Sequence, residues 1–279
     1  MLTTVMIKRL CADSIQAEQN TIVVGTPSPY SIAGFGEALA RMLGGKHLGT
    51  AMVVHSFNWQ SGHPKFVPYV FKAGAKTKEP PTLELVTADI CITLFVKIDV
   101  AELQPELLLN AITKIRICGK PLNGIPWFSG DEPISPKWMH GAELALLNDE
   151  AALRRAFKNV GFGWLLIDRK DLLEDRDELT DPLDAILDAV AMIKDEDGEW
   201  HRKQKGNIVP IHIGFQSIEE ASFRNISRRQ NERLKHALVE SMTSLGQFVS
   251  VRRVRAGELP KCFWIPTFDG TTSQYFVAA

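Results

Sequence analysis

The sequence predicts an α+β fold, and three observations support that prediction. Segments with alternating or continuous apolar residues, typical of strands, are interleaved with segments whose apolar residues recur every three or four positions, typical of helices. Over residues 1–119 these segments follow the order β-α-β-β-α-β. Of the 279 residues, 45% are apolar and 23% are charged, which suffices for the core of one large domain or two modest ones.

The first half, residues 1–119, is predicted to be a ferredoxin-like or RNA-recognition palm. Ser31 would cap the first helix, and Gly44 and Gly45 would end it. In such a fold two helices cover one face of an antiparallel sheet, and the other face is open to RNA. The expected elements are strands at 5–13, 49–59, 83–99 and 114–118, and helices at 31–43 and about 105–113.

The second half, residues 141–279, is predicted to be mixed α/β. An exposed loop at 120–140, rich in Gly and Pro, would separate the halves. Asp181 caps the first predicted helix, which has Pro182 at its first position, and Gly257 joins a closing pair of strands. The expected elements are strands at 162–168, 206–218, 249–257 and 261–268, a helix at 181–193 and a basic amphipathic helix at 225–245.

The charges are strongly segregated, although the formal net charge is only −1. Between Arg41 and Lys78 there are six Lys or Arg and no Asp or Glu, whereas 168–199 holds thirteen acids against four bases. From Trp200 to the end there are twelve bases and six acids. Such a chain can bind a polyanion on one face and keep another face for protein partners, although solvated surface helices would give the same pattern.

The N-terminal sequence and the cysteines indicate a cytoplasmic protein. No apolar run is long enough for a membrane span, and the first ten residues lack the apolar region of a secretory signal. Cys11, Cys91, Cys118 and Cys262 are scattered in apolar runs, as buried free thiols are, so we expect neither disulfides nor a zinc site.

Motifs for known enzyme chemistry are weak. The run from Gly34 to Leu39 is similar to a dinucleotide-binding loop, but Leu39 replaces the third glycine, and the acid expected about twenty residues later is missing. His47, His55 and His63 recur every eight residues, a spacing that does not fit the close pairs of metal-binding helices. We therefore expect no metal, no cofactor and no catalytic residue.

What remains is a set of side chains suited to RNA. Polar side chains before and at the first helix can bind phosphates, aromatic rings can stack on bases, and lysines and arginines supply charge. Lys65, Lys72, Lys76 and Lys78 lie in an acid-free excursion at about 60–82 that is predicted to be a hairpin finger. The other candidates are Asn20, Ser28, Tyr30, Ser31, Lys46, His55, Trp59, Trp127, Phe128, Arg224, Arg228, Arg229, Arg252 and Arg253.

Several of these segments together resemble a known family. The block from Asn20 to Leu39, with GTPSPYSIAGFGEAL, is similar to the N-terminal block of the second Csy protein of type I-F CRISPR systems. LGTAMVVHSFNWQ, FGWLLIDRKDLLED, DPLDAILDAVAM and GNIVPIHIGFQSI follow in the same order, as does ESMTSLGQFVSVRRV before Trp264. The acidic segment before Trp200 and the C-terminal tail depart from the family pattern.

The resemblance implies a Cas-five-type, non-catalytic subunit. Such a subunit has an RNA-recognition-like palm and a projecting finger, and it grips the 5′ handle of the CRISPR guide RNA. It docks the large Csy subunit and the first backbone Csy subunit, and it meets target DNA only indirectly through the complex. No membrane partner is expected.

Two alternatives remain open. A metal-free endoribonuclease that processes the precursor RNA could use His55 or His63 as a general base, and cleavage of repeat RNA would reveal it. A protein-interaction module without RNA would bind its partner with little dependence on salt, whereas a subunit that neutralises several phosphates loses affinity steeply as salt rises.

Overall fold

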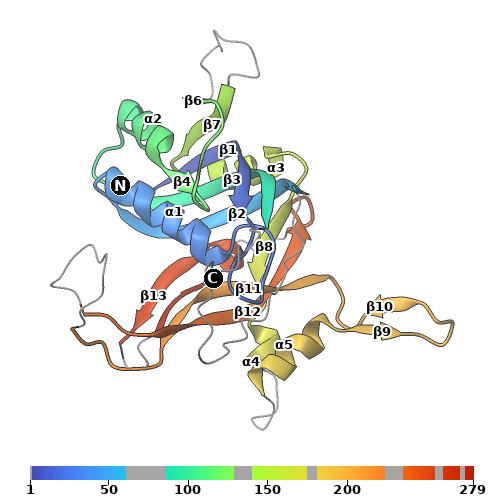
Figure 1. The fold of residues 1–279 in the computed structure, drawn as a ribbon. Coiled ribbons are helices and arrows are strands. Elements are labelled where there is room, and N and C mark those ends of the chain that lie inside the picture. Colours follow the sequence, from blue (N-terminus) through green and yellow to red (C-terminus); the bar gives the residue numbers. More distant parts are fainter. Residues whose placement is uncertain are drawn as a thin grey trace, which may run out of the picture.

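A computed structural model describes residues 2–60, 86–128, 140–174, 181–223, 235–254, 260–270 and 274–279. Most of its strands form one twisted sheet, with helices on both faces (Figure 1). The helices are α1 (Pro29–Met42), α2 (Pro105–Lys114), α3 (Glu150–Asn159), α4 (Asp171–Glu174) and α5 (Pro182–Val190). The strands are β1 (Leu2–Gln16), β2 (Lys46–Trp59), β3 (Thr87–Asp99), β4 (Arg116–Ile117), β5 (Lys120–Pro121), β6 (Ile125–Phe128), β7 (His140–Leu147), β8 (Trp164–Asp168), β9 (Met192–Lys194), β10 (Trp200–Arg202), β11 (Asn207–Ser217), β12 (Val239–Ser250), β13 (Ile265–Asp269) and β14 (Gln274–Ala278).

The main sheet joins both halves of the sequence. Its ten described strands lie in the order β13-β14-β11-β12-β8-β2-β3-β1-β7-β6, and within the described ranges every neighbouring pair is antiparallel except β6 and β7. The junction is the pairing of Val53 and Val54 of β2 with Leu165 and Trp164 of β8. The chain is therefore mixed α and β with a large, mostly antiparallel sheet, as the sequence predicts in outline.

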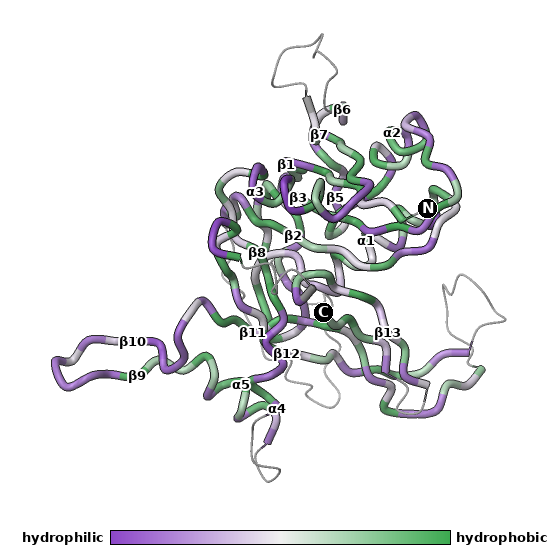
Figure 2. Tube along the Cα trace, turned by 180° about the vertical axis from the view of Figure 1, so that it is seen from behind, coloured by the Kyte–Doolittle hydropathy of each residue, from purple (hydrophilic) through white to green (hydrophobic). Residues whose placement is uncertain are grey.

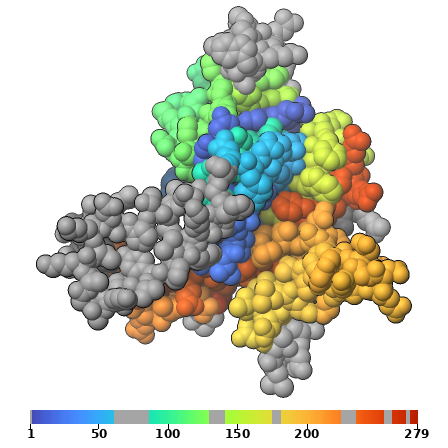
Figure 3. All heavy atoms as spheres, turned by 45° about the vertical axis from the view of Figure 1, so that its right-hand side comes forward, coloured from blue at the N-terminus to red at the C-terminus, as the bar shows by residue number. Residues whose placement is uncertain are grey.

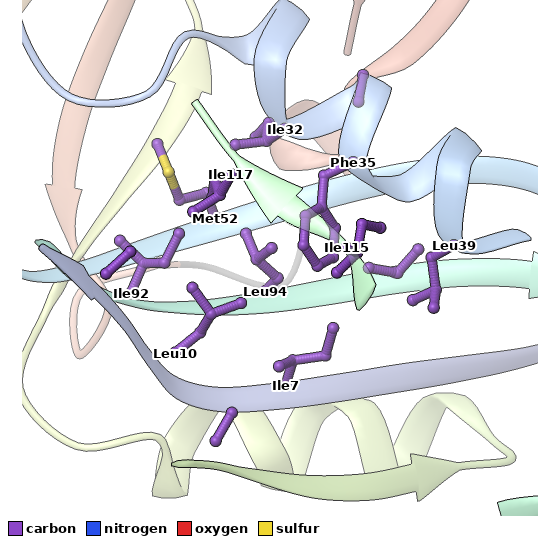
Figure 4. Close-up of a cluster of buried hydrophobic side chains, with 14 of the residues drawn as sticks. Ile7, Leu10, Ile32, Phe35, Leu39, Met52, Ile92, Leu94, Ile115 and Ile117 are labelled. Atoms are coloured by element: carbon purple, nitrogen blue, oxygen red, sulfur yellow. The ribbon is translucent and has the colours of Figure 1, made fainter. Parts of the chain in front are cut away.

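The main core lies between the sheet and α1 and α2. On α1, Ile32, Phe35 and Leu39 point toward apolar side chains of β1, β2 and β3 (Figure 4). Gly36 lies inside α1, where a Cβ atom would come within 2.2 Å of Thr50 Oγ1. Gly34 and Gly36, the glycines of the run that is similar to a dinucleotide-binding loop, therefore lie inside a helix. Gly36 lets α1 pack closely on β2.

A second core covers part of the opposite face, which the sequence predicts to be open. Leu153 and Phe157 of α3 pack there against Ala51 and Phe95 of the sheet. The rings of Phe95 and Phe157 are stacked with their centroids 4.1 Å apart. Helix α3, which has no counterpart among the predicted elements, covers this part of the sheet. The prediction of an open face is therefore wrong here.

Tertiary pairing also overrides several local predictions in the first half. The first helix begins earlier than predicted, with Ser28 rather than Ser31 as its N-cap, and Ser28 Oγ accepts a hydrogen bond from the Ser31 amide. The predicted strand at 114–118 shrinks to β4, which pairs with β5 outside the main sheet. The place beside β1 is taken by β7. The predicted loop at 120–140 contains β5, β6 and the first residue of β7.

Corrections in the second half concern its C-terminal third. The basic helix predicted at 225–245 is wrong from Lys235 onward: His236 forms an isolated antiparallel bridge with Ser222, and from Val239 the chain forms β12 between β11 and β8. The predicted strand at 249–257 ends at Ser250, so Arg252 and Arg253 lie in a turn. The strand that contains Ile265 pairs with β14 rather than with the 249–257 segment. The helix predicted at 181–193 ends at Val190.

Candidate nucleic-acid interface

A groove runs along the rim of the sheet where β8 and β11 begin and β12 ends. It consists of two adjoining hollows of about 430 and 320 Å³. Trp164, Asn207 and Phe248 line both hollows, so they form the wall between them. Figure 3 shows this side of the molecule, where residues near 160 (yellow-green), 210 (orange) and 250 (orange-red) meet. We call this groove the rim groove.

Aromatic rings and arginines share the rim groove. Phe162 is 60% exposed, and its ring stands edge-on to that of Trp164 with the centroids 6.1 Å apart. Phe248 is half-buried beside them. Arg253 lines one hollow and Arg202 the other, and both side chains are exposed. Partly exposed rings with nearby guanidinium groups can stack on unpaired bases and bind the phosphates between them.

Amide side chains add hydrogen-bonding capacity. Asn207 is exposed in the wall between the hollows, and Gln247 lines the first hollow. Arg169 Nη1 donates to Gln247 Oε1 at 2.6 Å, which fixes the orientation of that amide. Primary amides present both donors and acceptors, the combination that base edges require.

The loop that carries Phe162 is held against the sheet by close packing. A Cβ atom on Gly163 would lie 2.5 Å from Val53 Cγ1, so only glycine allows this approach. The carbonyl of Phe162 lies 2.6 Å from His55 Nδ1. On the other side of the ring, His55 Nε2 lies 2.7 Å from Thr93 Oγ1.

These contacts define the protonation state of His55. A carbonyl can only accept, so Nδ1 carries the proton, and the Thr93 hydroxyl donates to Nε2. The Thr93 hydroxyl also accepts from the Arg9 amide at 3.2 Å. Burial lowers the pKa of His55, which favours this neutral form. Both ring nitrogens are engaged, so His55 connects β2, β3 and the Phe162 loop.

A family model described as CRISPR-associated protein (Cas_Csy2) matches residues 5–277. The chain belongs to the Csy2 family. It is therefore a CRISPR-associated protein of the type I-F system and a subunit of a Csy complex, which confirms the resemblance seen in the sequence. No curated protein matches the chain significantly.

Within this Csy2-family chain, several predicted site residues have structural roles. Asn20 Nδ2 donates to Thr243 Oγ1 at 3.2 Å and ties the loop before α1 to β12. Ser28 and Ser31 form the N-terminal cap of α1. The ring of Tyr30 packs against His212, Phe215 and Tyr275. These side chains hold the fold together, and none of them lines the rim groove.

The remaining predicted residues are dispersed. Lys46 begins β2, and Trp59 ends it with its ring edge-on to Phe57. Trp127 and Phe128 lie on β6, at the far edge of the sheet. Arg252 is exposed in the turn beside Arg253, and only Arg253 lines the rim groove. Lys65, Lys72, Lys76, Lys78, Arg224, Arg228, Arg229 and the predicted finger at about 60–82 lie outside the described residues.

The groove residues that the sequence reasoning missed are Phe162, Trp164, Arg202, Asn207, Gln247 and Phe248. Most of them lie at strand ends. From the sequence, the segment FGW at 162–164 is predicted only as the start of a strand. Two aromatic residues around a glycine, at the start of a buried strand, are the one local signal that could have indicated them. In the described part of the chain, no three His, Cys, Asp or Glu side chains are grouped to hold a metal ion.

Three histidines that are buried or half-buried should make the stability of the fold sensitive to acid. Burial lowers the pKa of His47 to about 4, and it also lowers the pKa of His55 and His212. Unfolded histidines titrate near 6.5 and bind protons first, so the stability is complete above about pH 6.5 and falls as the pH approaches 4. We expect His47 alone to contribute a loss of about 1 kcal/mol between pH 7 and pH 5, after allowance for its partial exposure.

Urea unfolding at several pH values measures this effect. In His47→Gln the amide can still bond to Thr50 Oγ1, which lies 2.8 Å from His47 Nε2 in the native chain. The variant should lose the contribution of His47 to the pH dependence. Parallel pH profiles for the variant and the native chain would contradict the assignment.

Proposed function

We propose that the chain is a non-catalytic scaffold subunit that grips the 5′ handle of the guide RNA in its Csy complex. The observation that carries this proposal is the rim groove, where three aromatic rings and two arginines line adjoining hollows. Hollows of this size fall within the range of about 300–1,000 Å³ of small-molecule sites, which suits one or two splayed nucleotides. An open groove with exposed cations fits a single strand better than a duplex, whose bases are not available for stacking.

We also propose that the first half forms a ferredoxin-like palm together with β7, which follows it in the chain. The order β2-β3-β1-β7, with α1 and α2 packed on one face, supports this proposal. In the ferredoxin-like arrangement the fourth strand lies beside the first, and β7 has that position here. The rim groove begins where this palm meets β8.

The geometry of His55 supports a scaffold over the endoribonuclease. A general base needs a free lone pair within reach of the substrate hydroxyl. The lone pair of His55 Nε2 accepts from Thr93, whose side chain is fully buried. His63 lies outside the described residues.

The test is purification of the tagged full chain with the other subunits of its complex, followed by sequencing of the bound RNA. We expect a uniform population of guides with a common 5′ handle, and ultraviolet crosslinks from handle nucleotides to Trp164 or Phe248. The chain alone should leave repeat RNA intact. Recovery of no RNA would favour a protein-interaction module, whereas turnover of repeat RNA would establish the endoribonuclease.

We further propose that α5, β9 and β10 form a docking arm for another protein subunit. The hairpin of β9 and β10 projects from the body next to α5 (Figures 1 and 2). A two-stranded hairpin is marginally stable by itself in water, and large exposed apolar side chains are typical of protein interfaces. The exposed side chains of the arm are Leu183, Leu187, Met192, Ile193 and Trp200, each between 48% and 63% exposed.

The charge of the docking arm favours a protein over RNA. Residues 181–203 contain seven acids and three bases, a net charge of −4, which repels phosphates. A partner with an apolar centre and basic rim fits this surface, and the large Csy subunit is the occupant that we propose. The arm adjoins the rim groove at one point only among the described residues, Arg202 at the end of β10, which lines the second hollow.

We expect the double variant Leu187→Asp, Trp200→Asp to weaken association with the large subunit by at least about tenfold, because buried charge replaces interface anchors. Binding of guide RNA by the rim groove should be unchanged. The measurement is the yield of large subunit that co-purifies with the tagged chain. Leu107→Asp, at a similarly exposed leucine on α2, is the matched control, and equal losses in both variants would count against a docking role of the arm.

A further inference from the structure

Two cysteines face each other across neighbouring strands of the palm. Cys11 of β1 and Cys91 of β3 are directly opposite in the antiparallel register. Their chain neighbours Leu10, Ala12, Ile90 and Ile92 are buried in the core beneath α1. Because side chains alternate along a strand, both thiols lie on the opposite face. The sequence predicts buried thiols, but Cys11 and Cys91 are only half-buried, whereas Cys262 is buried.

The two thiols have different acidities. The adjacent Cys11 side chain and the positive charge of Arg9 lower the pKa of Cys91 to about 7 despite partial burial, and the Cys11 thiol also lies 3.4 Å from the Arg9 carbonyl, to which it can donate. The interaction with Cys91, together with burial, raises the pKa of Cys11. Near neutral pH a large share of Cys91 is therefore thiolate, whereas Cys11 keeps its proton. A thiolate that is partly exposed beside a cation is the reactive form of cysteine.

The local backbone allows the two sulfurs to approach. Directly opposite Cβ atoms in antiparallel strands are about 4.5–5.5 Å apart, and a disulfide requires about 3.5–4.5 Å. Register shifts lie on both sides of Cys11, between Ile7 and Leu10 and between Ala12 and Ile15. Arg9 and Ser14 within them have φ values of 56° and 51°. Such bulges interrupt the ladder, so the short segment between them can shift toward β3 without breaking the long flanking pairings.

We propose that Cys11 and Cys91 form a dithiol modification site that peroxides convert into a reversible intramolecular disulfide. The Cys91 thiolate attacks one peroxide oxygen, the O–O bond breaks, and the departing hydroxide takes up a proton to become water. The sulfur of Cys11 then attacks the sulfenic acid formed at Cys91, and the S–O bond breaks. The second hydroxide leaves as water with the proton of Cys11. Two thiols lose two electrons in total, and one peroxide becomes two water molecules.

Geometry makes this disulfide easy to reduce. A cross-strand bond that must draw the strands together stores strain, and strained, accessible disulfides have less negative reduction potentials than structural ones. Thiol reductants such as glutathione or dithiothreitol therefore regenerate the dithiol. Cys118 and Cys262 are separate from this pair, and burial raises the pKa of each. They serve as internal controls in the same chain.

The test treats the reduced full chain with hydrogen peroxide, blocks free thiols with an alkylating agent and identifies the peptides by mass spectrometry. We expect a Cys11–Cys91 crosslink that dithiothreitol reverses, formed at least about tenfold faster than any oxidation of Cys118, because more of Cys91 is thiolate. The rate should rise with pH through about 7 and then level off. Free Cys11 and Cys91 after peroxide treatment that oxidises Cys118, or a crosslink between two chains, would overturn the proposal.

A variant separates the two chemical steps. In Cys11→Ser the first step remains and the second cannot occur, so Cys91 should accumulate as a sulfenic acid that dimedone traps. In Cys118→Ser, the matched control, the disulfide should form as in the native chain. A disulfide between Cys91 and any other cysteine in Cys11→Ser would show that the cross-strand register does not define the pair.

Discussion

Charge reversal of the rim groove, with Arg202→Glu and Arg253→Glu combined, should reduce the affinity for guide RNA by about 30-fold or more at physiological salt. The two guanidinium groups lie in separate hollows on either side of the shared wall of Trp164, Asn207 and Phe248. One strand that passes this wall would place a phosphate near each of them. Each lost phosphate contact also lowers the salt slope by about 0.7 for a single strand, so the double variant should lose about 1.4.

Filter binding or fluorescence anisotropy at several salt concentrations measures both quantities. Lys114→Glu with Arg116→Glu is the matched control, since these residues lie at the end of α2 and on β4, on a different part of the molecule from β8 and β11. A salt slope that does not change in the groove variant would show that the RNA path avoids the rim groove. By itself, Trp164→Ala should lower the affinity for guide RNA by about tenfold, because stacking on a base contributes about 1–3 kcal/mol. The salt slope of this variant should not change.

The largest effect on stability is expected from Trp264→Ala. Trp264 is completely buried, and its amide and carbonyl both pair with Thr50 of β2 at 3.0 Å. Its ring lies in the core beneath α1, and the adjacent Cys262 and Phe263 lie in the core beneath α3. Loss of this side chain should lower the free energy of unfolding by about 3–5 kcal/mol.

Thermal and urea unfolding of the full chain test this prediction. Trp59→Ala makes the same chemical change at a side chain that is 57% exposed, and it should cost less than about 1 kcal/mol. Because Trp264 comes from the second half and Thr50 from the first, both halves should unfold in one transition that shifts as a whole. A variant in which only one of two transitions shifts would show that the halves unfold independently.

Local sequence patterns determined a large part of the first half. Apolar alternation and length located β1, β2 and β3, and the apolar spacing at Ile32, Phe35 and Leu39 located the helix that covers them. These patterns are informative because each residue's face is fixed by its own strand or helix. The collinear blocks from Asn20 to Trp264 also indicated the family, which the match over residues 5–277 confirms.

Only the tertiary structure decided which strand ends meet. Residues 239–245 end the basic amphipathic helix that the sequence predicts, yet 239–250 form β12 because β11 and β8 pair with it on both sides. Likewise β7 rather than β4 extends the sheet beside β1. Strand pairing joins residues far apart in the chain, and its energy comes from partners that no local window contains. Arg253 is predicted from the sequence as an RNA-binding residue. Phe162, Trp164 and Arg202 are not, because only the pairing of the strands places them in one groove with it.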